Sequence, residues 1–185
     1  MPPTPIQYRQ AERSDVSHMA RIWGLEKGEG GTSEERMAAY FDSQLHPQLA
    51  LPPRIIYVAC EGDALIGYIA GHLTLRFGCD GELQWLYVIP ERRRCGVASG
   101  LIPCLAAWFK QQSGARVCVN VARTNTAAIH LYAKHGAAPI KWAGWCGTIS
   151  PWPRKHEVDS VAATRQFSTG AERNNRTGVE SLRVF

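Results

Sequence analysis

The sequence predicts an α/β fold with a mixed sheet, whose first half is antiparallel, whose second half contains a parallel βαβ pair, and whose helices cover both faces. Two observations lead to this prediction. The strand candidates 55–60 and 64–73 are joined by a short turn around Gly62, which is typical of an antiparallel hairpin. The strand candidates 83–88 and 116–121 are instead separated by a helical pattern, and a βαβ connection makes such strands parallel.

The elements before the first hairpin follow the distribution of polar residues, glycine and proline. Residues 6–10 are a short strand candidate, and Ser14 is placed to cap a helix whose apolar residues recur at helical spacing. The glycine-rich stretch 24–31 ends this helix. Thr32 then opens a second helix with a capping box, and the proline-containing stretch 47–53 ends it.

The turn between the strand 83–88 and the following helix is the most informative segment. Pro90 closes the strand, because proline cannot donate to a sheet ladder, and apolar residues recur at helical spacing from Val97 onward, so a helix begins near Gly96. The first turn of a helix has unpaired N–H groups and the positive end of the helix dipole, and both attract a phosphate. Gly96 and Ala98 lack bulky side chains and let an anion approach the backbone.

Three arginines, Arg92, Arg93 and Arg94, precede this helix. Guanidinium groups bind phosphate oxygens in bidentate fashion, so fixed positive charge adds to the backbone donors. Arginines before a helix are more commonly solvated surface residues, and the basic turn by itself leaves that alternative open. Pro103 falls inside the predicted helix, where it removes one hydrogen bond and is expected to kink the axis.

Two motifs follow one another in this part of the chain. The first is Arg93-x-x-Gly96-x-Ala98 after a strand that ends Leu86-Tyr87-Val88-x-Pro90, and the second is Asn125-x-x-Ala128-x-x-Leu131-Tyr132-x-x-x-Gly136. In order and spacing they resemble the motifs of the GNAT N-acetyltransferase superfamily, and a weaker resemblance extends from Tyr8 to about Ile140. The resemblance implies a GNAT-like acyl-CoA N-acyltransferase fold that uses acetyl-CoA as the acyl-donor substrate.

The resemblance also implies where the donor binds. The pantetheine arm is expected in a cleft between the two parallel strands, paired with the main chain near Leu86 and Val88. The pyrophosphate is expected on the turn and the first helical residues, which are Arg93, Arg94, Cys95, Gly96, Val97, Ala98 and Ser99. Asn125 is expected to contact the cofactor from the start of the next helix, and a helix cap is the alternative interpretation of this asparagine.

Acyl transfer to an amine requires a group that takes a proton from the acceptor. Glu82 is the first candidate, because it shares the alternate-residue face of Gln84, Leu86 and Val88 on a central strand, where a retained carboxylate invites a functional explanation. The alternative is a solvated residue at the exposed start of the strand. Gln84 can orient a water molecule, and His72 is a second base candidate.

The leaving thiolate, with a pKa near ~8.5, needs less help than the amine. By its match to the second motif, Tyr132 is implied to direct its hydroxyl at the thioester sulfur as a general acid or hydrogen-bond donor, and a tyrosine packed on the sheet is the alternative. The N–H of Val88 or a neighbour is placed to stabilise the oxyanion. These roles describe direct transfer. Cys95 has no partnered His in the sequence and is not expected to be acylated.

Composition limits the other classes of function. A chain of 185 residues with 45% hydrophobic content suits a single domain, predicted over residues 1–150, with a polar and mobile C-terminal tail over 151–185. The net charge of +5 is scattered outside the arginine turn, so nucleic acid is not an expected partner. There is no apolar run of membrane-spanning length and no signal-peptide pattern, so a cytoplasmic location is expected without membrane contact. The six cysteines show neither metal-ligand nor redox spacing, so no metal site is expected.

These patterns predict a cytoplasmic N-acyltransferase that transfers acetyl from acetyl-CoA to the primary amine of a small molecule, as a monomer or homodimer. Residues 24–53 and 138–150, where the resemblance implies the acceptor pocket, carry no recognisable substrate code. Two alternatives stay open. One is a protein-amine acetyltransferase. The other is a non-catalytic acyl-CoA-binding sensor or regulatory module, which would tolerate Glu82→Gln and Tyr132→Phe without functional loss.

Overall fold

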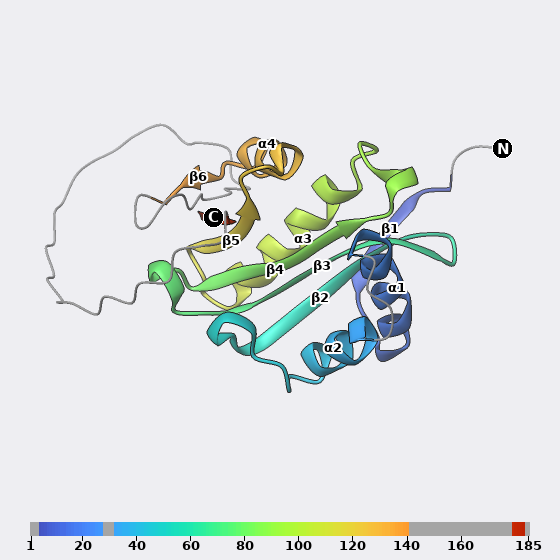
Figure 1. Cartoon of the computed structure of the whole chain (residues 1–185), viewed down its shortest axis with the longest axis horizontal. Helices are drawn as coiled ribbons and strands as arrows, with labels where there is room; N and C mark the ends of the chain where they lie inside the picture. Colours follow the sequence, from blue (N-terminus) through green and yellow to red (C-terminus); the bar gives the residue numbers. More distant parts are fainter. Residues whose placement is uncertain (1–3, 28–31, 141–178, 184–185) are drawn as a thin grey trace, which may run out of the picture.

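A mixed sheet with helices on both faces forms the centre of the molecule (Figure 1). The computed structural model describes residues 4–27, 32–140 and 179–183, and within these ranges the sheet has seven strands in the order β1-β2-β3-β4-β5-β7-β6. The strands are β1 (Ile6–Gln10), β2 (Leu51–Glu61), β3 (Ala64–Leu73), β4 (Gly81–Val88), β5 (Val117–Ala122), β6 (Ala138–Pro139) and β7 (Val179–Arg183). Neighbouring strands from β1 to β4 are antiparallel and β4 pairs with β5 in parallel, which confirms the predicted mixed sheet.

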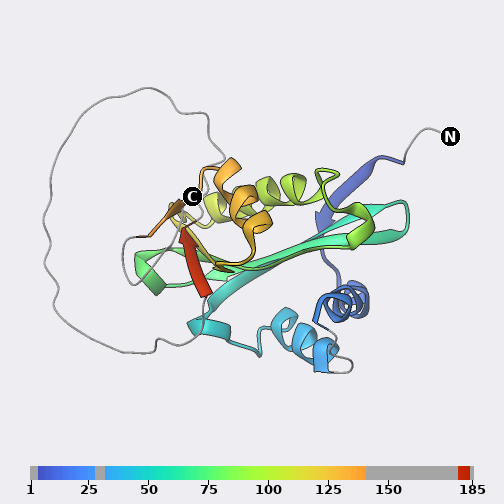
Figure 2. The same cartoon turned by 45° about the horizontal axis from the view of Figure 1, so that its top comes forward.

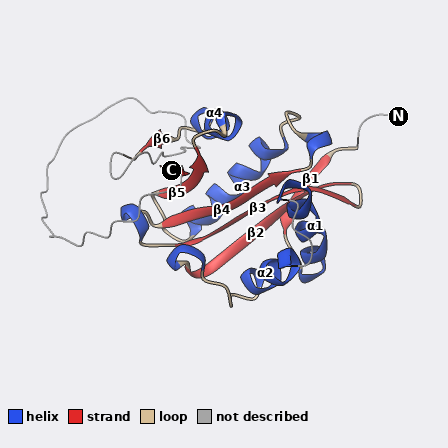
Figure 3. Cartoon of the chain, viewed as in Figure 1, coloured by secondary structure: helices blue, strands red, loops and turns tan. Residues whose placement is uncertain are grey.

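Two pairs of helices cover the two faces of the sheet (Figures 2 and 3). They are α1 (Val16–Lys27) and α2 (Thr32–Phe41) on one face, and α3 (Val97–Gln111) and α4 (Thr126–Lys134) on the other. The core on the α1/α2 face includes Met19, Met37, Tyr40, Val58 and Tyr68, and the core on the α3/α4 face includes Leu101, Ile102, Leu105, Phe109 and Val117. Side chains of β2 and β3 therefore alternate between two buried layers, as expected for a sheet covered on both sides.

The two N-terminal helices begin differently from the expectation. Ser14 lies inside the 3-10 turn Arg13–Asp15, and Asp15 holds the start of α1, because its carboxylate accepts the N–H of Glu12 at 2.7 Å. The same carboxylate binds the Arg9 guanidinium at 2.7 and 2.9 Å, and this hydrogen bonding holds the pKa of Asp15 below its ordinary value. Thr32 is itself the first residue of α2 rather than its cap.

The second strand is longer than the predicted 55–60. It begins at Leu51 and includes Pro52 and Pro53, which the sequence assigns to the end of the preceding helix. The sheet tolerates both prolines because the register with β3 shifts between Leu51 and Arg54, so neither proline needs to donate to the ladder there.

The C-terminal part of the chain adds one strand that the sequence does not predict. Strand β6 lies at the start of the segment 138–150 in which the resemblance implies part of the acceptor pocket, and residues 141–178 lie outside the described residues. Strand β7 pairs with β5 and with β6, both antiparallel, within the region predicted as a polar tail. The division into a domain over 1–150 and a tail over 151–185 stays a prediction.

Candidate active site

Strands β4 and β5 separate along their length and leave a cleft between them. They pair from Gly81–Val117 to Leu83–Val119, after which β4 continues to Val88 and β5 to Ala122. The cleft has a volume of about 390 Å³. Its lining includes Gln84, Val88, Arg93, Asn120, Asn125 and Tyr132. The cleft is therefore closed at the Leu83 end and opens toward the turn that follows β4.

A β-bulge lies at the closed end of this cleft. Ala70 pairs with Trp85 and Gly71 pairs with Leu83, so Gln84 is an extra residue of β4 without a partner on β3. The side-chain carbonyl oxygen of Gln84 is buried and has no hydrogen-bond partner within the described residues. An unsatisfied buried acceptor costs about 1–3 kcal/mol.

The bulge changes which residues of β4 share a face. Trp85 belongs to the core under α1 and α2, whereas Leu86 and Val88 pack against the core under α3 and α4. Glu82 lies on the same side as Trp85, because the extra residue Gln84 shifts the alternation by one position. The predicted face shared by Glu82, Gln84, Leu86 and Val88 is therefore not formed, because Leu86 and Val88 lie on the side of the sheet opposite Glu82. The alternation of apolar residues does not reveal a bulge.

The main chain of Leu86 and Val88 points toward the cleft. The Ile89 N–H donates to the Ile66 carbonyl at 3.0 Å. The adjacent Gly67–Val88 pair is therefore a non-hydrogen-bonded pair of the antiparallel ladder. Peptide groups at such positions point away from the partner strand, here toward β5, and the same holds two residues earlier at Leu86. The Val88 carbonyl accepts the Nε–H of Arg93 at 3.0 Å.

The turn between β4 and α3 contains two residues in the left-handed region, Arg94 with φ 64° and Gly96 with φ 83°. A Cβ atom on Gly96 would meet no atom within 4 Å, so the space beside this backbone is open. Arg93 and Arg94 are exposed here. Arg92 instead pairs with Glu61 at the end of β2, its Nε donating to Oε2 at 2.9 Å. Two of the three predicted arginines thus remain at the turn.

The first turn of α3 has no side-chain cap. Its leading N–H groups have no acceptor inside the helix, and they lie next to the exposed turn. The Val97 side chain is buried in the core, so this residue presents only its main chain, while Ala98 and Ser99 are partly exposed and Cys95 is exposed. The helix continues past Pro103 to its last residue, so the proline does not end it.

Helix α4 contributes two of the predicted residues to the cleft. Asn125 is its N-cap, with Oδ1 accepting the Ala128 N–H at 3.1 Å, so the helix-cap interpretation is confirmed. Asn125 also lines the cleft, and its side-chain NH₂ group is still available as a donor. Tyr132 lies seven residues, about 10 Å along the axis, from Asn125, and lines the same cleft. Burial raises the pKa of Tyr132 above the ordinary value for a phenol, so the hydroxyl stays protonated at neutral pH.

Glu82 is buried behind the cleft in a network of donors. Its side chain is 1% exposed, which excludes the alternative of a solvated residue at the strand start. Arg76, from the 3-10 turn Arg76–Gly78, places Nη1 at 2.9 Å from both carboxylate oxygens, and Asn120 on β5 donates its Nδ2–H to Oε1 at 2.8 Å. Asn120 also lines the cleft and so connects the carboxylate to it.

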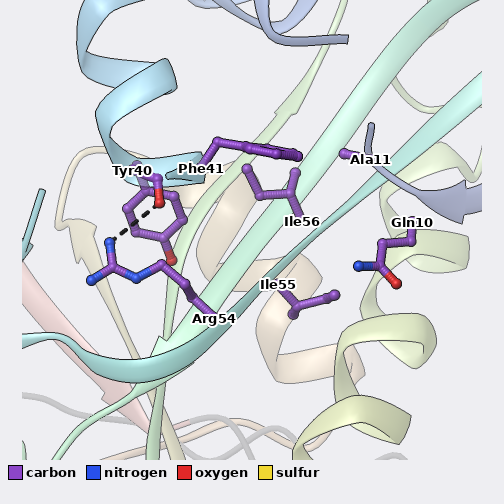
Figure 4. Close-up of a pocket in the computed structure, with 7 residues that line it drawn as sticks. All are labelled: Gln10, Ala11, Tyr40, Phe41, Arg54, Ile55 and Ile56. Carbon is purple, nitrogen blue, oxygen red and sulfur yellow. Dashed lines mark hydrogen bonds between the residues drawn. The ribbon is translucent and has the colours of Figure 1, made fainter. Parts of the chain in front are cut away.

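His72 lies on the side of Glu82 away from the cleft. It is fully buried, its Nε2 is 3.8 Å from Glu82 Oε2, and its Nδ1 is 3.1 Å from the Tyr40 hydroxyl. Tyr40 packs against the Arg54 guanidinium, which lies 4.8 Å from the ring centroid and donates to the Tyr40 carbonyl at 3.3 Å, beside a cavity of about 170 Å³ (Figure 4). His72 is therefore a neighbour of Glu82 rather than a residue of the cleft.

Arg76, Asn120 and Tyr40 are absent from the sequence-based site. Asn120 carries a usable signal, because it is a polar residue inside an otherwise apolar buried strand, Val117–Ala122. Arg76 carries none, since its position depends on how the turn after β3 folds.

Two further properties concern other classes of protein. Across the described ranges, no group of three or more His, Cys, Asp or Glu side chains is arranged to hold a metal ion. Among the described helices, none combines the length and the apolar character that crossing a bilayer requires.

Comparison with known proteins identifies the family. Residues 19–137 match the model of the acetyltransferase (GNAT) family, which is more than half of the chain. The chain therefore belongs to the GNAT acetyltransferase family, as the two sequence motifs predict. A search of curated proteins found no match.

Solved structures share the fold at low sequence identity. PaiA N-acetyltransferase from Thermoplasma acidophilum, in complex with coenzyme A, aligns with a TM-score of 0.57 and 18% identity over 76% of this chain and 94% of that one. Ard1 from Thermoplasma volcanium aligns with a TM-score of 0.58 and 21% identity over 73% of this chain and 84% of that one. An acetyltransferase from Thermus thermophilus aligns with a TM-score of 0.59 and 17% identity over 77% of this chain and 93% of that one. These alignments confirm the GNAT-like fold.

Proposed function

We propose that the protein is an acyl-CoA-dependent N-acyltransferase, which transfers acetyl from acetyl-CoA directly to the primary amine of a small molecule. The observation that carries this proposal is the cleft between β4 and β5, which joins outward main-chain groups, an uncapped helix N-terminus and a buried tyrosine. Membership of the GNAT family supports it. The structure of the Thermoplasma acidophilum relative with coenzyme A supports the class of donor.

The cleft fits an extended donor with a pyrophosphate at its open end. The first-turn N–H groups of α3, the open space beside Gly96 and the positive charges of Arg93 and Arg94 suit a phosphate. The outward peptide groups of Leu86 and Val88 suit the amides of the pantetheine arm, and the NH₂ group of Asn125 adds a donor near the open end. Acetyl-CoA supplies the activated acyl group, and the chain has to bind it, orient it and handle two protons.

Tyr132 acts at the sulfur side of the transfer. Its hydroxyl is protonated at neutral pH because burial raises its pKa. A coenzyme A thiol has an ordinary pKa of about 8.5, well below that of this phenol, so Tyr132 stabilises the departing thiolate by donating a hydrogen bond rather than by giving up its proton outright.

Glu82 acts at the amine side, from behind Asn120. An alkyl amine with a pKa of about 10.4 is free base in roughly one of 2,500 molecules at pH 7, a penalty of about 4.6 kcal/mol before attack. Asn120, which lines the cleft, links the carboxylate of Glu82 to it, but Arg76 and Asn120 occupy the oxygens of that carboxylate. We therefore propose that the proton reaches Glu82 through water, not by direct contact with the amine, while Asn120 holds the carboxylate in place with its hydrogen bond.

Two alternatives have specific observations in their favour. The hydrogen bonds on both oxygens of Glu82 favour a sensor that binds acyl-CoA without turning it over. A fold shared with the NatC complex, which was solved with Gag peptide and CoA, at 19% identity and a TM-score of 0.58, favours a protein amine as acceptor. The small-molecule acceptor is retained because the sequence carries no acid-rich or peptide-reading feature.

Calorimetry and thermal unfolding with acetyl-CoA test the donor site first. S-acetylpantetheine, which has the same thioester arm without the pyrophosphate, is the matched control. Acetyl-CoA at a hundred times its Kd is expected to add about 2.7 kcal/mol of stability and raise Tm by several degrees, with a smaller effect of the control. Equal effects of the two compounds, or no effect of either, would exclude the turn between β4 and α3 as a pyrophosphate site.

A further inference from the structure

Gln84 has an acceptor atom that nothing in the described protein uses. Its side-chain carbonyl oxygen is buried and unpartnered, and the residue lines the cleft. Buried polar side-chain atoms are normally hydrogen-bonded, so such an atom in a ligand cleft points to a ligand donor. The bulge places Gln84 outside the β3–β4 register, so its side chain is not fixed by a cross-strand partner.

The position of Gln84 indicates which part of the reactants it meets. It lies beside the closed end, where Leu83 pairs with Val119, and roughly 13 Å of extended strand separates it from Val88 at the open end. A donor whose pyrophosphate lies at the turn after Val88 therefore has its thioester end, and the attacking amine, near Gln84. Peptide groups nearer the open end, such as that of Leu86, are left for the pantetheine amides.

The chemistry of the atom limits its partner further. A carbonyl oxygen accepts hydrogen bonds only, and the thioester itself has no N–H or O–H to donate. The acceptor amine does. Resting on the function proposed above, we propose that the Gln84 carbonyl oxygen binds one N–H of the acceptor amine and thereby selects primary over secondary amines.

The selection follows from counting hydrogens on the nitrogen. During transfer the N–C bond forms and the C–S bond breaks, one proton leaves the nitrogen, and one proton is gained by coenzyme A as its free thiol. A primary amine has two N–H groups, so one is lost while the other stays on Gln84 and remains in the product amide. A secondary amine has one N–H, which cannot serve both purposes.

The test compares methylamine with dimethylamine, two probes that are small enough for the cleft and similar in basicity. Thiol release from acetyl-CoA is measured for the wild type, Gln84→Met, Gln84→Glu and the control Gln7→Met on the edge strand β1. The wild type and control are expected to use methylamine about tenfold faster. Gln84→Met is expected to release thiol about tenfold more slowly with methylamine, so that its rates with methylamine and dimethylamine become nearly equal. Gln84→Glu, which keeps an acceptor oxygen, is expected to retain the preference for methylamine.

Two further readouts separate this role from others. Gln84→Met is expected to unfold at the wild-type temperature or above it, because the carbonyl oxygen has no hydrogen-bond partner to lose among the described residues. A lower unfolding temperature would indicate a structural role. A tenfold weaker affinity for acetyl-CoA in calorimetry, with the amine ratio unchanged, would assign Gln84 to the pantetheine arm and overturn the inference. A wild type that binds acetyl-CoA and releases no thiol with either amine would instead contradict the proposed function itself.

Discussion

Gly96→Ala is the most selective perturbation of the turn before α3, which is the proposed phosphate site. Gly96 has φ 83°, a left-handed conformation that costs a residue with a Cβ about 1–2 kcal/mol. The new methyl group meets no protein atom within 4 Å, so the cost in the free protein is conformational strain alone. For a chain of 185 residues this lowers Tm by roughly 2–8 °C. In the proposed complex with acetyl-CoA, the methyl group is expected to occupy the space through which a phosphate oxygen would reach the N–H groups of α3.

Gly62→Ala is the matched control. Gly62 has φ 59°, its Cβ would also meet nothing within 4 Å, and it lies in the β2–β3 turn rather than in the turn before α3. Thermal unfolding is expected to show a similar loss of stability in both variants. Calorimetry is expected to show about tenfold or more weaker acetyl-CoA binding, about 1.4 kcal/mol, in Gly96→Ala alone. Equal affinities of the two variants would refute the assignment of a phosphate to this turn.

Two further predictions concern charge. Arg93→Gln is expected to weaken acetyl-CoA binding by about tenfold or more, because a charged hydrogen bond is lost. Arg92→Gln is expected to leave the affinity unchanged, because Glu61 holds the Arg92 guanidinium. Equal losses of affinity in the two variants, measured by calorimetry, would contradict this difference between the two arginines. Burial, and secondarily Lys134, lowers the pKa of His135, so stability is full above the unfolded value of about 6.5 and decreases as the pH falls through the lower folded value. Urea unfolding at about pH 7.5 and about pH 5 checks this, and His135→Gln is expected to flatten the difference.

Local sequence patterns were sufficient for most of the fold. The Gly62 turn, the closure of a strand before Pro90 and the helical spacing after Gly96 are each properties of neighbouring residues, and each matches the structure. Strand β7 was not predictable in this way, because its pairing partners, β5 and β6, are distant in sequence. The prolines of β2 were assigned to a helix end because their tolerance depends on a register shift that needs β3 in place.

The site was predictable to the same extent. The sequence predicts the turn with Gly96 and the helix with Tyr132 because each motif is local, and in the structure both line or border one cleft. Their roles in binding and catalysis stay predictions. The environment of Glu82 was not, since the bulge at Gln84 reverses its face and Arg76 reaches it from a separate turn. The face on which Glu82 lies and its hydrogen-bond partners therefore depend on tertiary contacts, which the alternation of residues along one strand does not predict.

The central claim is amine-dependent acyl transfer, and thiol release from acetyl-CoA with a panel of primary amines measures it directly. The account predicts release that depends on an amine, with Tyr132→Phe slower by about a hundredfold and its calorimetric affinity for acetyl-CoA nearly unchanged. Wild-type protein that binds acetyl-CoA and shows no amine-dependent release would contradict the enzyme and favour the sensor. Equal rates in the wild type and Tyr132→Phe would remove Tyr132 from the mechanism.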